Sequence, residues 1–109
     1  MLTLEACKAL KAMGFDQRVP SMVWHGRKAS PNHYDWALEP RFTVPRADNN
    51  QEAQWYACPD SIDALDWLAA QFGGTWQRDT DYWFSAPRQF IRRADTPSAL
   101  IVAVAQVLG

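Results

Sequence analysis

Tryptophan is the residue that most constrains how this chain folds, because it occurs six times in 109 residues. An indole is large, rigid and partly polar, so it either fills a hydrophobic core or anchors a contact surface. Four of the indoles lie in predicted strands that have an inward face, and we expect three or all four of these in the core: Trp24, Trp55, Trp76 and Trp83. The pattern assigns no inward position to Trp36 or Trp67.

The composition predicts one soluble globular domain over residues 1–109. Hydrophobic residues make up 48% of the chain and charged residues 21%, which is typical of a globular domain. The formal net charge of −1 argues against a protein that grips duplex nucleic acid, because such proteins usually carry a clear positive excess. The opening residues do not resemble a signal peptide, and the longest apolar run, 99–107, is about half a membrane span. We therefore expect a cytoplasmic protein without a membrane partner.

Helix-capping residues predict three helices. Thr3 is a good N-cap for a helix over residues 4–13, and Gly14 supplies the left-handed residue that ends it. Asp60 caps a second helix, which ends at Gly73 and whose apolar stripe begins at Ile62. Thr96, followed by a proline in the first turn, opens a third helix that runs to residue 108.

Short segments with alternating polarity predict the strands, at residues 22–25, 41–44, 54–58, 75–78, 82–85 and, as an edge strand, 89–92. Turn residues stand at 48–50 and 79–81, and tight turns imply antiparallel pairing. Residues 26–40 are predicted to be irregular, apart from a helical turn or two after Ser30-Pro31 with Tyr34 facing inward. The sequence thus predicts an α+β fold: an antiparallel sheet of four to five short strands, with about three helices packed mainly on one face.

Residues that could support catalysis or metal binding are few. His25, His33 and Asp35 form the one cluster of that kind, but a spacing of eight between the histidines matches neither helical ligand spacing nor the common zinc patterns. A polar surface is the favoured interpretation, so we predict no catalytic residue, no metal site and no cofactor. Cys7 and Cys58 are expected to be reduced and buried, with a Cys7–Cys58 bridge as the alternative.

Two sets of residues are candidates for binding. The first is a protein-binding site made of Trp36, Trp67, Asp66 and Tyr34, since indoles without an inward position are typical anchors. The two indoles could equally cover each other across the loop.

The second set consists of Arg88, Arg92 and Arg93 around Phe90, an interleaving that is typical of single-stranded nucleic-acid binding. Edge strands also carry charge simply to prevent aggregation, and the absence of net positive charge favours that interpretation.

Three segments resemble small uncharacterised proteins encoded by bacteriophages and prophages: LEACKALKAMGF at 4–15, SIDALDWL at 61–68 and DTPSAL at 95–100. The resemblance covers the helices, about a third of the chain, and brings no catalytic residues with it. It implies a cytoplasmic protein made in an infected bacterium. We expect a non-enzymatic accessory protein that acts by binding another protein, one version of which blocks a host defence such as CRISPR. The alternatives are a single-stranded nucleic-acid-binding module and a small enzyme with a cleft around His25.

Overall fold

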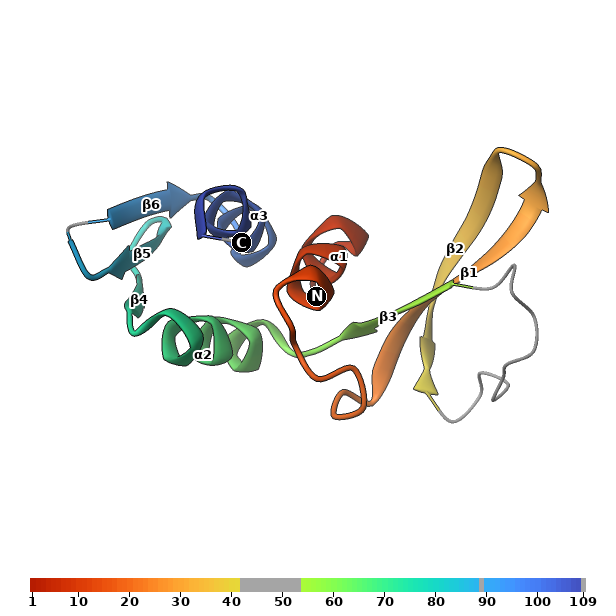
Figure 1. The fold of residues 1–109 in the computed structure, drawn as a ribbon, viewed down its shortest axis with the longest axis horizontal. Coiled ribbons are helices and arrows are strands. Elements are labelled where there is room, and N and C mark those ends of the chain that lie inside the picture. Colours follow the sequence, from red (N-terminus) through yellow and green to blue (C-terminus); the bar gives the residue numbers. More distant parts are fainter. Residues whose placement is uncertain (42–53, 89, 109) are drawn as a thin grey trace.

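The structure, a computed structural model, describes residues 1–41, 54–88 and 90–108 of the chain. Within these ranges the fold is α+β, with three helices and six strands (Figure 1). The helices are α1 (Leu4–Ala12), α2 (Ser61–Phe72) and α3 (Pro97–Leu108). The strands are β1 (Met22–Ser30), β2 (His33–Pro40), β3 (Gln54–Cys58), β4 (Thr75–Arg78), β5 (Tyr82–Ala86) and β6 (Phe90–Ala94).

The strands divide between two antiparallel sheets, with the orders β2-β1-β3 and β4-β5-β6. The prediction of a single sheet with four to five strands is therefore corrected to two sheets of three among the described residues. The reason lies at the end of β3, where Pro59 lacks the N–H needed to continue a ladder and α2 then leads the chain away. The helices pack on one another and on different strands: α1 packs on α3 and β3, α2 packs on β4 and β5, and α3 packs on β5 and β6.

The predicted irregular segment is instead a long β-hairpin. β1 pairs with β2 from Met22↔Pro40 to Ser30↔His33, with a register shift between Lys28 and Ser30. From His33 to Leu38 the side chains of β2 alternate between exposed and half-buried, which is the period of two expected for a strand. Ser30-Pro31, which predicted a helix start, opens the turn of this hairpin. The predicted strand at 41–44 and turn at 48–50 lie, apart from Arg41, outside the described residues.

The three helices confirm the capping predictions. The Thr3 hydroxyl accepts a hydrogen bond from the Ala6 N–H at 3.2 Å, and the Asp60 carboxylate accepts one from the Ile62 N–H at 3.1 Å. Gly73 ends α2 in the left-handed conformation, with φ 64°. Ile62 does not join the apolar stripe of α2, because its side chain is 57% exposed.

The main core lies between the three helices and β5. Its largest fully buried members are Phe84, Leu2, Leu10, Leu65, Leu68, Leu100, Ile101 and Val104. All six indoles are half-buried, and those of Trp24, Trp67 and Trp76 pack against this core. The prediction of core positions is therefore correct for Trp24 and Trp76, whereas Trp55 and Trp83 lie outside the core.

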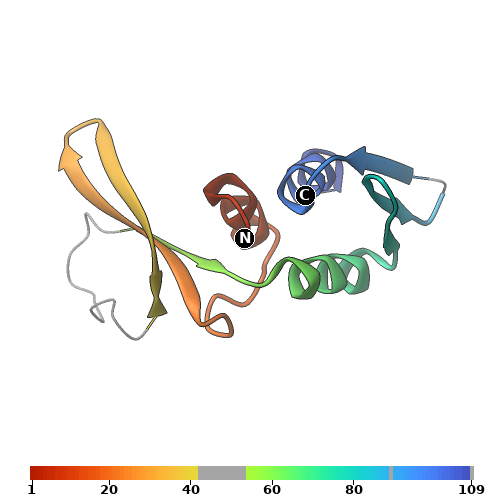
Figure 2. The same cartoon turned by 180° about the vertical axis from the view of Figure 1, so that it is seen from behind.

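The molecule is elongated, with extents of 44 × 27 × 23 Å. Its radius of gyration is 14.9 Å, against about 13 Å for a compact domain of this length. Helix α1 lies between the two parts: β1, β2 and β3 extend to one side of it, and the remaining elements lie on the other (Figures 1 and 2). None of the described helices has the length and apolar character needed to cross a membrane.

Candidate binding surface

The indole of Trp36 lies across β1, directly over Gly26. The two residues face each other in the β1–β2 register. A Cβ atom at Gly26 would come within 2.7 to 2.8 Å of three atoms of the Trp36 ring, which is closer than real Cβ contacts. The absence of a side chain at position 26 thus makes room for the ring to pack on the sheet.

Two tyrosines and Lys8 surround this indole, and Lys11 lies over one of the two tyrosines. The ring centroid of Trp36 lies 6.0 Å from that of Tyr34 and 5.7 Å from that of Tyr56 on β3. Helix α1 places Lys8 Nζ 5.1 Å from the Trp36 ring centroid and Lys11 Nζ 5.0 Å from that of Tyr56. We call these five residues the aromatic–lysine surface. Its rings are half-buried and its lysines are exposed.

The chemistry of the aromatic–lysine surface favours anionic partners that also present apolar or planar groups. An ammonium group over a ring is attracted by the negative face of the π-system, and the contact is worth about 0.5–1 kcal/mol at an exposed site. Each lysine is therefore held near the rings but keeps protons for a carboxylate or phosphate. Lys11 Nζ also donates to the backbone carbonyl oxygen of Trp55 at 3.5 Å, which positions it at the edge of β3.

The predicted protein-binding residues are separated by the fold. Tyr34 and Trp36 lie together on the aromatic–lysine surface. Trp67 instead packs edge-to-face on Phe15, with ring centroids 5.1 Å apart, and contacts the core. Asp66 accepts a hydrogen bond from the Trp76 indole N–H at 2.7 Å. Trp67 therefore has the inward position that the sequence pattern did not assign, and the two unassigned indoles belong to different clusters.

The predicted nucleic-acid residues are also divided, because neighbouring positions on β6 face opposite sides of the sheet. Arg92 lies over the ring of Phe90, with its guanidinium carbon 5.2 Å from the ring centroid. Arg93 pairs with Asp81, Nε to Oδ2 at 2.6 Å, and lies over the indole of Trp83. Arg88 occupies the exposed turn before β6, with φ 71°. These arginines do not form one continuous face with Phe90.

The histidine cluster is likewise not assembled. His33 Nε2 lies 2.9 Å from Asp35 Oδ1, and both side chains are exposed on β2. His25 is buried on β1, where its Nδ1 lies 3.4 Å from Glu39 Oε2. His25 faces Ala37, four residues along β2 from His33, so the two histidines are about 13 Å apart along the strand. Within the described ranges, no group of three or more His, Cys, Asp or Glu side chains is placed to hold a metal ion.

The sequence pattern named Tyr34 and Trp36, which lie on this surface, but it did not name Tyr56, Lys8 or Lys11. The one local indication of this surface in the sequence is Gly26. A glycine inside a strand often marks a place where another group approaches the backbone. Comparison with protein-family models, curated proteins and solved structures finds no significant match to this chain. The geometry of the aromatic–lysine surface is therefore the basis for the functional argument.

Proposed function

We propose that this chain is a non-enzymatic binding protein that contacts a protein partner through the aromatic–lysine surface. The observation that supports the proposal is the convergence of Tyr34, Trp36 and Tyr56 with Lys8 and Lys11 at one part of an elongated molecule. Binding energy at protein interfaces is concentrated in a few anchors, among which tryptophan and tyrosine are enriched. Cationic groups beside such anchors select an acidic partner surface.

The distribution of charge supports an acidic partner as well. Residues 1–41, which include β1, β2 and α1, contain six Lys and Arg against four Asp and Glu, a net charge of +2. Residues 54–108 contain four Arg against six Asp, a net charge of −2. All members of the aromatic–lysine surface except Tyr56 therefore belong to the positive part of a chain whose total charge is slightly negative. A partner that carries carboxylates would be steered towards this part.

The resemblance to bacteriophage and prophage proteins supplies a context for the proposal. In that context the chain acts in the cytoplasm of a bacterium, and its partner is a host protein, for example a component of a defence system. A surface with fixed rings suits such a role, because rings held against a sheet lose little conformational entropy on binding.

The test compares two tryptophan variants in affinity capture from bacterial lysate. Trp36→Ala removes the central ring, whereas Trp83→Ala, which removes a half-buried indole from the other sheet, is the matched control. We expect the wild-type chain and Trp83→Ala to capture the same protein from the lysate. The dissociation constant of that protein's complex with Trp36→Ala should be about thirtyfold higher or more. Circular dichroism would check that both variants are folded. Equal affinity for all three chains would contradict the proposal.

Single-stranded nucleic acid is a second candidate, favoured by the presence of lysine ammonium groups and three rings on one surface. Bases stack on aromatic side chains while lysines contact phosphates. Titration of the intrinsic tryptophan fluorescence with a mixed-sequence oligonucleotide at low salt tests it. Quenching that salt reverses and Trp36→Ala abolishes would assign the surface to nucleic acid rather than to protein.

A further inference from the structure

Two cysteine thiols from distant parts of the sequence meet inside the molecule. Cys7 lies on α1 and is fully buried, and Cys58 is the last residue of β3 and is 5% exposed. Both are free and belong to the main core. The two thiols are neighbours in that core, where Cys7 acts as a hydrogen-bond donor towards Cys58, and Cys58 Sγ lies 3.7 Å from the Leu2 carbonyl oxygen, to which it donates.

The surroundings make the two thiols chemically different. The hydrogen bond from Cys7 lowers the pKa of Cys58 to about 7, against the opposing effect of burial. The same hydrogen bond and burial raise the pKa of Cys7. The Trp24 indole N–H donates to the Leu2 carbonyl oxygen at 3.2 Å, and its nearness to the two thiols acts to lower the pKa of each. Cys58 is therefore the nucleophile of the pair, because the thiolate is the reactive form.

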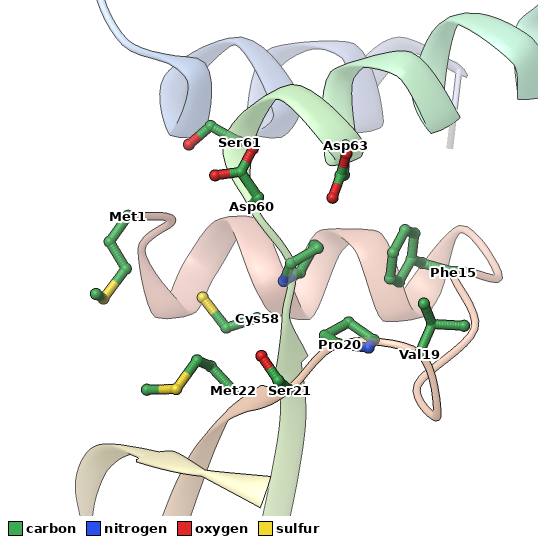
Figure 3. Close-up of a pocket in the computed structure, with 11 residues that line it drawn as sticks. Met1, Phe15, Val19, Pro20, Ser21, Met22, Cys58, Asp60, Ser61 and Asp63 are labelled. Atoms are coloured by element: carbon green, nitrogen blue, oxygen red, sulfur yellow. The ribbon is translucent and has the colours of Figure 1, made fainter.

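A groove of about 530 Å³ leads to Cys58 but not to Cys7. Its walls are mostly apolar, with Phe15, Val19 and Met22 among them, and two carboxylates, Asp60 and Asp63, lie at its α2 side (Figure 3). Cys58 is one of the residues that line the groove. A small uncharged solute can enter there and reach Cys58, whereas Cys7 is fully buried and does not line the groove.

We propose that Cys58 and Cys7 form a peroxide-oxidisable pair, in which hydrogen peroxide enters the groove, oxidises Cys58 and leads to a Cys7–Cys58 disulfide. The Cys58 thiolate attacks one peroxide oxygen, the O–O bond breaks, and the departing hydroxide takes a proton to become water. The Cys7 sulfur then attacks the sulfenic sulfur of Cys58, an S–S bond forms, and hydroxide leaves with the proton that Cys7 gives up. In total, two thiols and one peroxide give one disulfide and two waters.

The disulfide would connect α1 covalently to β3. These two elements carry Lys8, Lys11 and Tyr56 of the aromatic–lysine surface, so the bond would fix the lysines relative to the sheet. This consequence concerns the geometry of the chain itself and holds whichever partner the surface binds.

The test is limited oxidation of the reduced full chain by hydrogen peroxide, followed by intact mass measurement and peptide mapping. Once any mass added by methionine oxidation is subtracted, we expect the chain to lose about 2 Da. The peptide map should contain a linked peptide that joins Cys7 to Cys58, and dithiothreitol should separate it into its two parts. In Cys7→Ala, Cys58 should remain as a sulfenic acid that dimedone traps. In Cys58→Ala, thiol-dependent peroxide consumption should fall about tenfold or more.

Three results would overturn the proposal. The wild-type chain could keep both thiols at peroxide doses that oxidise free cysteine, or Cys58 could become a sulfinic acid without formation of the linked peptide. The third such result is a rate of peroxide consumption that is unchanged in Cys58→Ala. The wild-type peptide map decides the matter even if a core variant does not fold, because it needs no substitution. Thermal melts followed by circular dichroism would identify such a variant. Mixing isotopically labelled and unlabelled chains would show that the linked peptide arises within one molecule.

Discussion

Replacement of Gly26 by alanine tests how the aromatic–lysine surface is built. The new Cβ would approach three atoms of the Trp36 ring to 2.7–2.8 Å. The ring has little freedom to move away, because Tyr34, Tyr56 and Lys8 surround it. We therefore expect Gly26→Ala to displace the indole from the sheet and to lower the free energy of unfolding.

The size of the effect follows from two opposing terms. Forcing an extra methyl group into a packed position lowers stability by about 1–3 kcal/mol. Alanine in place of a strand glycine raises it by about 0.5–1 kcal/mol, because the unfolded chain loses freedom. The net loss is about 1–2 kcal/mol, which corresponds to a melting temperature lower by about 5–15 °C in a domain of this size.

A double-mutant cycle separates the contact from general effects at position 26. Urea unfolding is measured for the wild-type chain, Gly26→Ala, Trp36→Ala and the double variant. In the Trp36→Ala background the overlapping ring is absent, so Gly26→Ala should be neutral or should stabilise by about 0.5 kcal/mol. An equal loss of stability in both backgrounds would refute the reasoning, since the alanine would then be unfavourable for reasons unrelated to the indole.

Two further predictions concern the core and the thiol pair. Phe84→Ala should lower the free energy of unfolding by about 3–5 kcal/mol, because this ring is fully buried. The control is Ile91→Ala on the neighbouring strand, where the residue is 55% exposed, and it should change the free energy of unfolding by less than about 0.5 kcal/mol. If urea unfolding gave the two variants similar losses of stability, Phe84 would not be a core residue. The alkylation rate of Cys58 by iodoacetamide should rise through about pH 7, because only the thiolate reacts and the hydrogen bond from Cys7 lowers its pKa. In Cys7→Ala the rise should move towards pH 8.5, and an unchanged midpoint would count against that hydrogen bond.

The helices were predictable because the residues that begin and end them act locally. Thr3 and Asp60 cap helices whose hydrogen bonds lie within three residues of the cap, and Gly73 adopts a conformation that few other residues tolerate. The β1–β2 hairpin was missed for a local reason too. A serine followed by a proline starts turns as well as helices, and the register shift after Lys28 interrupts the alternation that identifies a strand.

The aromatic–lysine surface could be predicted only in part, because its members come from elements that are distant in the sequence. The sequence pattern identifies Trp36 as a ring without a place in a core, but nothing near it indicates that α1 will lie over the sheet and bring Lys8 to its face. Trp67 was misassigned because a helical wheel predicts one buried stripe. Helix α2 has neighbours on more than one side, and the chain after α1 places Phe15 against the side that carries Trp67.

The outer part of the β1–β2 hairpin has a consequence for how this protein can change. No residue between His25 and Ala37 belongs to the main core or packs against it. Substitutions in the exposed turn at residues 30–32, beyond Gly26, Tyr34 and Trp36, can change this end of the molecule while the packing between the helices stays intact. The hairpin turn is thus a place where sequence can diversify at little risk to folding, and a rational site for inserting a foreign segment into this scaffold.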